Sequence, residues 1–365
     1  MKILITGAHF TPAVAVVEEL KKYPDVHVVY VGRKTTQEGD PSPSAESKVL
    51  PKLGVKYIPI VTGRLQREFT PYTLLSLLKI PVGFIQALII VLSEKPKVVL
   101  SFGGYVAVPT VFTAWLFSIP IIVHEQTLVS GLANKISSFF ADKIALSFRR
   151  DGFADKTLLT GDPIRSMIVN GVKLAHPRGV LRSHRKTILI TGGNQGSHII
   201  NKTVEECLNK LTKIANIIHV TGDNKFKDFE RLKGLGGKEG LEGKYSVEKW
   251  IGEEWGEVLS NADLVVSRAG INTLTELSFL GKPALVVPIP YLYKDEQNKN
   301  AKFFENLGLV KILPQKKLSA DTLLKNIRLM LDDLPNLKDK AKKAKEVIIP
   351  DAAKRLALET VLLGN

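Results

Sequence analysis

The sequence predicts an α/β protein of two domains, each built on a doubly wound parallel sheet. At 365 residues the chain is long for a single hydrophobic core. Short runs that are apolar on both faces alternate with helix-length segments, which is typical of parallel sheets covered by helices on both sides. The letters ILITG occur twice, at 3–7 and 188–192, and each time open a glycine-containing turn. We therefore expect these stretches to be the first strand and first turn of two separate domains.

The remaining strands follow from the same pattern. For the first domain we predict strands at 2–6, 26–32, 55–61, 97–102, 119–125 and 143–148, and for the second at 186–192, 216–222, 245–251, 262–268 and 283–289. A charged stretch with two prolines, two glycines and no strong period lies at 163–185 and should contain the boundary. The domains are expected at 1–163 and 164–349. A C-terminal helix at 350–365, with Asp351 as its N-cap, is expected to pack back on the first domain.

Composition narrows the possible partners. The chain has 51 Lys and Arg against 36 Asp and Glu, a net charge of +15. This excess indicates an anionic partner: a phosphorylated ligand, an acidic membrane surface or nucleic acid. The single cysteine, Cys207, excludes an intrachain disulfide and fits a reducing compartment. The start MKILITG leads straight into a strand, so no signal peptide is expected. The scattered histidines lack ligand spacing, so no metal site is predicted.

The segment 74–92 is almost wholly apolar and allows two interpretations. A membrane span needs about 20 apolar residues, and Lys79, Pro81 and Gln86 interrupt this run. The predicted strands on either side should belong to one sheet, which a span between them would disrupt. We therefore expect a helix of the first domain.

Three glycine-containing turns join a predicted strand to a predicted helix: TGAHFTP at 6–12, GGNQGS at 192–197 and SRAGINTLTEL at 267–277. Such turns expose backbone N–H groups at a helix N-terminus, which favours anion binding. Each glycine alone could simply permit a tight turn. A nicotinamide-dependent reductase is a rival function, but the G-x-G-x-x-G spacing is missing. The Tyr-x-x-x-Lys matches at 30–34 and 245–249 fall in or beside predicted strands.

Two residues are candidates for a general base. His9 follows the first glycine turn, and an imidazole titrates near neutral pH. Glu125 ends the predicted strand IIVHE, directly after His124, and should reach the same sheet edge. A histidine at such a position could also be structural.

Taken together, the motifs resemble those of the MurG-like N-acetylglucosaminyltransferases of glycosyltransferase family 28. The matching stretches, in order, are TGAHFTPA at 6–13, SFGGYVAVP at 101–109, IPIIVHEQ at 119–126 with Gly131 and Asn134, GDPIR at 161–165, GGNQGSHIIN at 192–201, SRAGINTLTEL at 267–277 and DEQNKNA at 295–301. The resemblance implies the GT-B fold, in which two Rossmann-like domains face each other across a cleft.

The resemblance also implies a reaction. These enzymes transfer GlcNAc with inversion from UDP-GlcNAc to the 4-hydroxyl of undecaprenyl-diphospho-MurNAc-pentapeptide, converting lipid I to lipid II in peptidoglycan synthesis. They need no cofactor and no nucleic acid, and they work as peripheral proteins on the cytoplasmic face of the membrane. The apolar segment 74–92, flanked by Arg64, Arg67, Lys79, Lys95 and Lys97, would bind an anionic membrane surface. The alternative is a helix simply buried in the first domain. The sequence does not indicate an oligomeric state.

The family's site residues carry over by position. Ile251 matches the family residue that contacts uracil, and Glu276 matches the one that contacts the ribose. Arg165 and Gln297 match two further residues that contact the sugar donor. The residues matching the diphosphate and sugar cradle are Asn194, Ile271, Asn272, Thr273, Leu274 and Thr275, and those matching the loop at the reacting centre are Thr6, Gly7, Ala8 and His9.

The chain departs from the family at several positions around the sugar and the reacting centre. Ala8 stands where the family has glycine, so a Cβ could crowd a phosphate. Thr127 replaces an asparagine that touches the donor sugar, and Asn194 and Glu296 also differ from the family. A different UDP-sugar or acceptor, or a fold-retaining protein without turnover, therefore stay open as alternatives.

Overall fold

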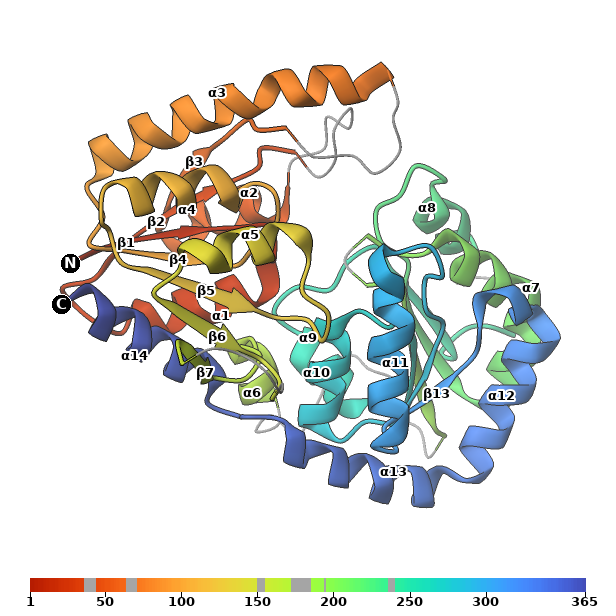
Figure 1. The fold of residues 1–365 in the computed structure, drawn as a ribbon. Coiled ribbons are helices and arrows are strands. Elements are labelled where there is room, and N and C mark those ends of the chain that lie inside the picture. Colours follow the sequence, from red (N-terminus) through yellow and green to blue (C-terminus); the bar gives the residue numbers. More distant parts are fainter. Residues whose placement is uncertain (36–43, 64–70, 150–154, 172–184, 194, 236–239) are drawn as a thin grey trace. The chain divides into compact units, whose positions relative to one another are not determined.

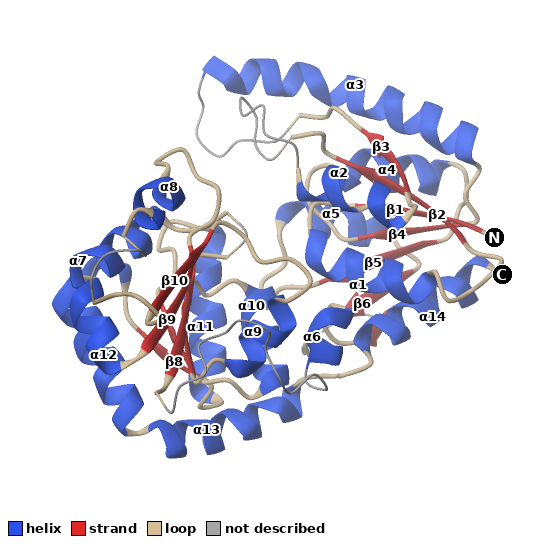
Figure 2. Ribbon diagram, turned by 180° about the vertical axis from the view of Figure 1, so that it is seen from behind, coloured by secondary structure: helices blue, strands red, loops and turns tan. Residues whose placement is uncertain are grey.

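The computed structural model describes residues 1–35, 44–63, 71–149, 155–171, 185–193, 195–235 and 240–365. The chain forms two compact units, of which the first comprises Met1–Arg165 with Ile349–Asn365 and the second comprises Ser166–Ile348 (Figure 1). Each unit contains one parallel sheet with helices on both faces (Figure 2). The predicted α/β class is confirmed.

Within the described residues, the sheet of the first unit has seven strands in the order β3-β2-β1-β4-β5-β6-β7. The strands are β1 (Lys2–Thr6), β2 (His27–Gly32), β3 (Lys56–Pro59), β4 (Val98–Ser101), β5 (Ile121–Glu125), β6 (Lys143–Leu146) and β7 (Thr157–Leu159). Successive side chains of a strand point to opposite faces, and here both faces are apolar. Ile3 and Ile5 pack on one side of the sheet and Leu4 on the other.

Helices cover both faces of this sheet. They are α1 (Phe10–Leu20), α2 (Ala45–Val49), α3 (Pro71–Glu94), α4 (Ala107–Leu116), α5 (Leu132–Phe140) and α14 (Ala352–Gly364), with a 3-10 turn η1 (Pro51–Leu53). The C-terminal helix α14 contacts α1 and β4, so the end of the chain returns to the first sheet. Asp351 is the N-cap residue of α14, as predicted. Its side chain makes no capping hydrogen bond, and its carboxylate instead accepts a hydrogen bond from Arg355 Nε at 2.8 Å.

Over the part of the second unit that is described, six parallel strands have the order β10-β9-β8-β11-β12-β13. They are β8 (Thr187–Thr191), β9 (Asn216–Val220), β10 (Tyr245–Glu248), β11 (Leu264–Ser267), β12 (Ala284–Val286) and β13 (Val310–Ile312). The helices are α6 (Ser166–Gly171), α7 (His198–Ile214), α8 (Asp228–Lys233), α9 (Trp255–Asn261), α10 (Ile271–Leu280), α11 (Glu296–Asn306), α12 (Ala320–Asp332) and α13 (Leu334–Lys343), with 3-10 turns η2 (Tyr293–Asp295), η3 (Gln315–Lys317) and η4 (Ala344–Val347).

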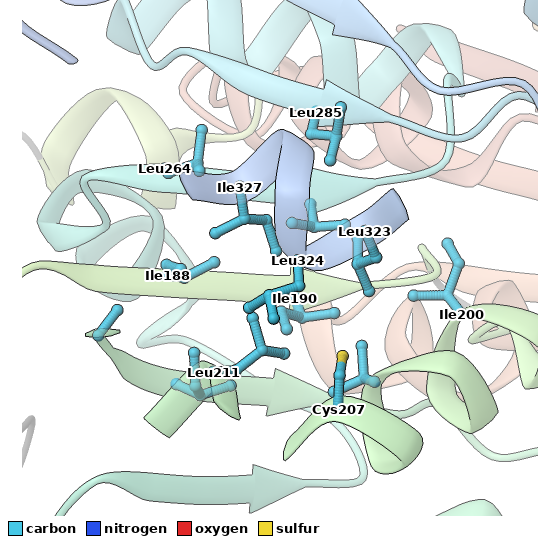
Figure 3. Close-up of a cluster of buried hydrophobic side chains, with 14 of the residues drawn as sticks. Ile188, Ile190, Ile200, Cys207, Leu211, Leu264, Leu285, Leu323, Leu324 and Ile327 are labelled. Carbon is cyan, nitrogen blue, oxygen red and sulfur yellow. The ribbon is translucent and has the colours of Figure 1, made fainter. Parts of the chain in front are cut away.

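The core of the second unit lies between its sheet and the helices α7 and α12. Figure 3 shows this cluster, in which Cys207 and Leu211 from α7 and Leu323, Leu324 and Ile327 from α12 pack against Ile188 and Ile190 of β8. Cys207 is a buried, unpaired thiol. All eleven predicted strands are present. β7 and β13 were not predicted, because each is a three-residue edge strand too short to show a period.

Helix α3 packs on the first sheet but leaves much of its apolar surface exposed. By length and composition alone, Ser76–Glu94 is the one described helix that could cross a membrane. Its inner side chains Ala87 and Ile90 join the core on one face of the sheet, and its neighbours β3 and β4 belong to that same sheet. Leu78, Ile85 and Ile89 are 59–64% exposed. The helix is therefore neither a span across the first unit nor simply buried in it.

Candidate active site

The two sheets each have a point where the strand order reverses. In the first unit this point lies between β1 and β4, and in the second between β8 and β11. Ligands of doubly wound proteins bind at the carboxyl ends of the strands at such points. The loop with His9 follows β1, and the GGNQGS loop follows β8. The predicted glycine turns therefore coincide with the expected ligand positions of both sheets.

The loop after β1 lies very close to the loop after β4. Gly7 has φ +145°, and a Cβ at this position would be only 2.8 Å from the carbonyl carbon of Phe102. The Ala8 N–H donates to the Gly103 carbonyl oxygen at 2.9 Å. A Cβ on Gly104 would lie 2.7 Å from the Ala8 methyl group. Ala8 is accommodated here because its neighbour in the second loop is a glycine.

His9 is half-buried and stands immediately before α1. Among the described residues neither of its ring nitrogens has a hydrogen-bond or ion-pair partner. Burial lowers the pKa of His9, the charge of Glu125 raises it, and the charge of Arg33 lowers it. An imidazole that is mainly neutral at neutral pH and has free ring nitrogens can accept a proton from a bound hydroxyl.

Glu125, at the end of β5, has both carboxylate oxygens engaged. Oε1 accepts from the Thr127 N–H at 3.2 Å and from the Thr127 hydroxyl at 3.0 Å. Oε2 accepts from Asn134 Nδ2 on α5 at 3.2 Å. Glu125 is only 4% exposed. The carboxylate is thus buried, and its position is fixed by hydrogen bonds to Thr127 and Asn134.

The adjacent histidine has a structural environment. The His124 ring is buried, and its Nε2 lies 3.1 Å from Ser147 Oγ and 3.3 Å from the Gly161 carbonyl oxygen. Burial lowers the pKa of His124 to about 3, against a smaller upward effect of the Gly161 hydrogen bond. The ring stays neutral at physiological pH and links β5 to the residues after β7.

In the second unit the glycine-rich loop packs closely against the end of β9. Gly196 has φ +72°, and a Cβ there would stand 1.9 Å from the Thr221 carbonyl oxygen. The helix α7 follows this loop; the side chain of its N-cap residue Ser197 makes no capping hydrogen bond, and its first turn contains no acidic residue. The predicted ligand contact Asn194 lies outside the described residues.

The start of α10 is a second helix N-terminus that follows a strand. Its N-cap residue is Gly270, which has no side chain to cap the helix, and its first turn contains no acidic residue. Asn272 and Thr273 are partly exposed there, whereas Ile271, Leu274 and Thr275 are buried. The first turn can therefore present N–H groups to an anion, while the following residues anchor the helix to the sheet.

Glu276 and Ile251 both belong to the second unit. The Glu276 carboxylate is 4% exposed, and its Oε2 accepts from the Trp255 indole N–H at 3.1 Å. Ile251 is half-buried just beyond β10, and Trp250 before it is 62% exposed. On α11, Gln297 Oε1 accepts from the Ile289 N–H at 3.0 Å.

Comparison with known proteins identifies the family. The N-terminal domain model of glycosyltransferase family 28 matches residues 6–146, and the C-terminal domain model matches residues 187–356. The chain belongs to glycosyltransferase family 28. Two members of comparable length are 34% identical to it. One, from Bacillus cytotoxicus, aligns with 98% of this chain and 97% of its own length. The other, from Clostridium kluyveri, aligns with 90% of each. Both are named UDP-N-acetylglucosamine--N-acetylmuramyl-(pentapeptide) pyrophosphoryl-undecaprenol N-acetylglucosamine transferase.

Solved structures share the fold. MurG of Acinetobacter baumannii superposes with a TM-score of 0.72 at 24% identity, covering 99% of both chains. A UDP-GlcNAc 2-epimerase from Neisseria meningitidis, bound to UDP-GlcNAc, gives 0.65 at 16% identity and covers 99% of this chain and all of its own. These matches confirm the predicted GT-B architecture of two Rossmann-like domains.

The family 28 residues predicted from the sequence gather on the expected edge of each unit. Thr6, Gly7, Ala8, His9, Glu125 and Thr127 lie at the carboxyl edge of the first sheet, and Ile251, Ile271 to Glu276, and Gln297 follow β10, β11 and β12 of the second. Arg165 is the last residue of the first unit before α6. No group of three or more His, Cys, Asp or Glu that could hold a metal occurs among the described residues.

Two residues that hold the candidate carboxylates have little signal in the sequence. Asn134 and Trp255 each hold a candidate carboxylate, from 9 and 21 residues away along the chain. Asn134 was noted only as part of the family pattern. The tyrosines of both Tyr-x-x-x-Lys matches lie in strands, where Tyr30 donates to the Gly7 carbonyl oxygen and Tyr245 contacts His219. Neither has the surroundings of a catalytic tyrosine, and the reductase alternative loses its support.

Proposed function

We propose that this chain transfers N-acetylglucosamine, with inversion, from UDP-GlcNAc to the 4-hydroxyl of undecaprenyl-diphospho-MurNAc-pentapeptide, the step from lipid I to lipid II. The observation that carries the proposal is the half-buried His9 ring, which follows β1 at the strand-order reversal of the first sheet and is acted on by the charge of Glu125. Among the described residues this ring has no hydrogen-bond or ion-pair partner. It occurs in a family 28 chain whose relatives bear that activity in their names.

In the proposed reaction His9 accepts the proton of the acceptor hydroxyl as its oxygen bonds to C1 of the sugar. The bond from C1 to the diphosphate breaks on the opposite side, and UDP leaves. The growing negative charge of UDP is stabilised by the N–H groups at the start of α10, including those of Asn272 and Thr273. Ile251 contacts uracil and Glu276 the ribose hydroxyls.

The geometry favours His9 over Glu125 as the base. A base must reach the proton that it removes. Both oxygens of Glu125 already accept hydrogen bonds from Thr127 and Asn134, and the carboxylate is 4% exposed. The ring nitrogens of His9 have no partner among the described residues. We assign Glu125 to charge stabilisation beside His9.

We also propose that the first unit binds an anionic membrane surface peripherally, on the cytoplasmic side, where its acceptor is presented. Helix α4 packs against α3, and at its end Trp115 and Phe117 are 47% and 46% exposed. Exposed apolar surface of this extent marks an interaction site. Lys95 and Lys97, at the end of α3, are exposed and would meet anionic lipid headgroups. Arg64 and Arg67 lie outside the described residues.

A panel of ligands tests the donor assignment. Ligands that bind only the folded state raise the melting temperature, so UDP-GlcNAc, UDP-glucose, UDP-galactose, UDP, NADH and NADPH should be compared. The largest rise is expected with UDP-GlcNAc. An equal rise with every UDP compound would favour the alternative of another sugar, and a rise only with a nicotinamide cofactor would contradict the proposal.

The variant His9→Ala separates binding from chemistry. It should keep the UDP-GlcNAc shift and lose roughly 100- to 10,000-fold in transfer, the usual contribution of a general base. Unchanged transfer by this variant would refute the role of His9. Retained binding without any transfer by the wild-type protein would favour the alternative of a fold-retaining protein that has lost turnover.

A further inference from the structure

We infer that Thr127 and Asn134 are positioning residues that fix Glu125 as a stationary negative charge beside His9, and that Thr127 serves this purpose in place of a contact to the donor sugar. The inference rests on the proposed function for its catalytic meaning. Its geometric basis lies wholly within the first unit.

The Thr127 side chain is turned toward Glu125. It is 7% exposed, and its hydroxyl lies 3.0 Å from Glu125 Oε1 and 2.8 Å from the Val129 carbonyl oxygen. Its backbone N–H also donates to Oε1. The single hydrogen of this hydroxyl is shared between the two acceptors, so Thr127 has no hydrogen left to donate to a sugar. The asparagine that the family has at this position would have a second polar atom to offer.

Asn134 holds the other carboxylate oxygen. Its Nδ2 donates to Glu125 Oε2 at 3.2 Å and to the His124 carbonyl oxygen at 3.3 Å. Both partners are acceptors, so only the amide nitrogen can face them, which fixes the orientation of the side chain. A Cβ on Gly103 would lie 2.0 Å from Asn134 Oδ1. Asn134 is therefore confined against the loop whose carbonyl binds Ala8, next to His9.

The Thr127 N–H and Asn134 Nδ2 donate to the two oxygens of Glu125, and the Thr127 hydroxyl shares its single hydrogen between Glu125 Oε1 and the Val129 carbonyl oxygen. No ion pair within 4.0 Å joins Glu125 to His9 in the described structure, so the carboxylate acts on the imidazole through space. Its effect then depends on where the carboxylate is held, and this is set by Thr127 and Asn134.

Few of the described groups act on His9, so the effect of the Glu125 position on the pKa of His9 can be tested. Among the described residues, the charged or titratable groups that act on it are Glu125 and His124 from β5 and Arg33 after β2. Arg33 is itself paired with the buried Glu46 at 3.8 Å. Of these groups only Glu125 favours the protonated imidazole, so a loosened Glu125 should be seen directly in the titration of His9.

The experiment is a pH titration of the histidine ring signals by NMR in the full-length protein, with His9 assigned by its loss in His9→Gln. Thr127→Val removes the hydroxyl at nearly constant volume, and Thr127→Ser keeps it as a matched control. We expect His9 to titrate roughly 0.5–1 pH unit lower in Thr127→Val, part of the roughly 1–3 units that an adjacent opposite charge exerts. Thr127→Ser should titrate like the wild type. Thr127→Ala, which also lacks the hydroxyl, serves if the valine variant does not fold.

Two further readouts separate the possible outcomes. In transfer assays the acidic limb of the kcat/KM profile should move to lower pH in Thr127→Val, whereas loss of a sugar contact would raise the KM for UDP-GlcNAc without moving the limb. An unchanged His9 titration in both variants that lack the hydroxyl would overturn the inference. Since the NMR titration needs no turnover, it decides the role of Thr127 even if the proposed transfer reaction is not found.

Discussion

Replacing Ile85 and Ile89 of α3 together by serine should release the protein from anionic membranes without unfolding it. The two side chains lie one turn apart on the same side of the helix and are 59% and 60% exposed. Full burial of an isoleucine side chain is worth roughly 1.5–3 kcal/mol. Scaled by the exposed fractions, transfer of both side chains from water into the membrane is worth roughly 2–3.5 kcal/mol. Loss of this free energy in the double variant should weaken membrane partitioning about 30- to 400-fold.

The assay is flotation with vesicles containing phosphatidylglycerol, at fixed salt. Leu329→Ser is the matched control, because Leu329 is 52% exposed on α12 of the second unit and should leave partitioning unchanged. Circular dichroism and thermal melts check that both variants stay folded. Equal partitioning of the double variant and the wild type would refute the role given to α3.

Three further predictions concern two buried titratable groups, Glu125 and His219, and the close backbone contact of Gly196. Glu125→Gln removes the charge that raises the pKa of His9, so the acidic limb of the kcat/KM profile should move to lower pH and the plateau should fall; an unmoved limb would contradict the pairing. Burial lowers the pKa of His219 to about 4, so between pH 6.5 and 4 the unfolded chain binds more protons and stability falls with falling pH, by up to roughly 1.4 kcal/mol per pH unit for this group. Urea unfolding of His219→Gln should show a correspondingly shallower pH dependence, and a slope equal to that of the wild type would count against it. Gly196→Ala places a Cβ 1.9 Å from a carbonyl oxygen, whereas Gly193→Ala, also at positive φ, meets open space. Gly193→Ala should lower the free energy of unfolding in urea by roughly 1–2 kcal/mol, and Gly196→Ala should lower it clearly more. Equal losses in the two variants would contradict the close contact between position 196 and the Thr221 carbonyl oxygen.

Much of the fold could be predicted because its signals are local. Buried parallel strands are apolar on both faces, and the repeated ILITG marks the first strand of each sheet. The two missed strands, β7 and β13, are three-residue edge strands with partial exposure, for which alternation cannot be recognised. Asp351 has the residue type and position of an N-cap, but Arg355 one turn later attracts its carboxylate. Such competition between side chains is decided by the rotamers and leaves no periodic signal.

The candidate site was predictable as a set of loops and less so as a set of contacts. Glycine turns after strands place His9 and the start of α10 at the strand-order reversals, since sheet topology follows from the order of elements. The partners of the carboxylates were not predictable in the same way. Asn134 reaches Glu125 from α5, and Trp255 reaches Glu276 from α9, across distances that only the packed fold defines.

The central claim is tested most directly by incubating the purified protein with UDP-GlcNAc and a lipid-linked MurNAc-pentapeptide diphosphate, and analysing both products by mass spectrometry. The account predicts that one GlcNAc is added to the acceptor for each UDP released, and that His9→Ala does neither at a comparable rate. Release of UDP without a glycosylated acceptor, or conversion of UDP-GlcNAc to its 2-epimer, an activity named for proteins that share the fold, would contradict it.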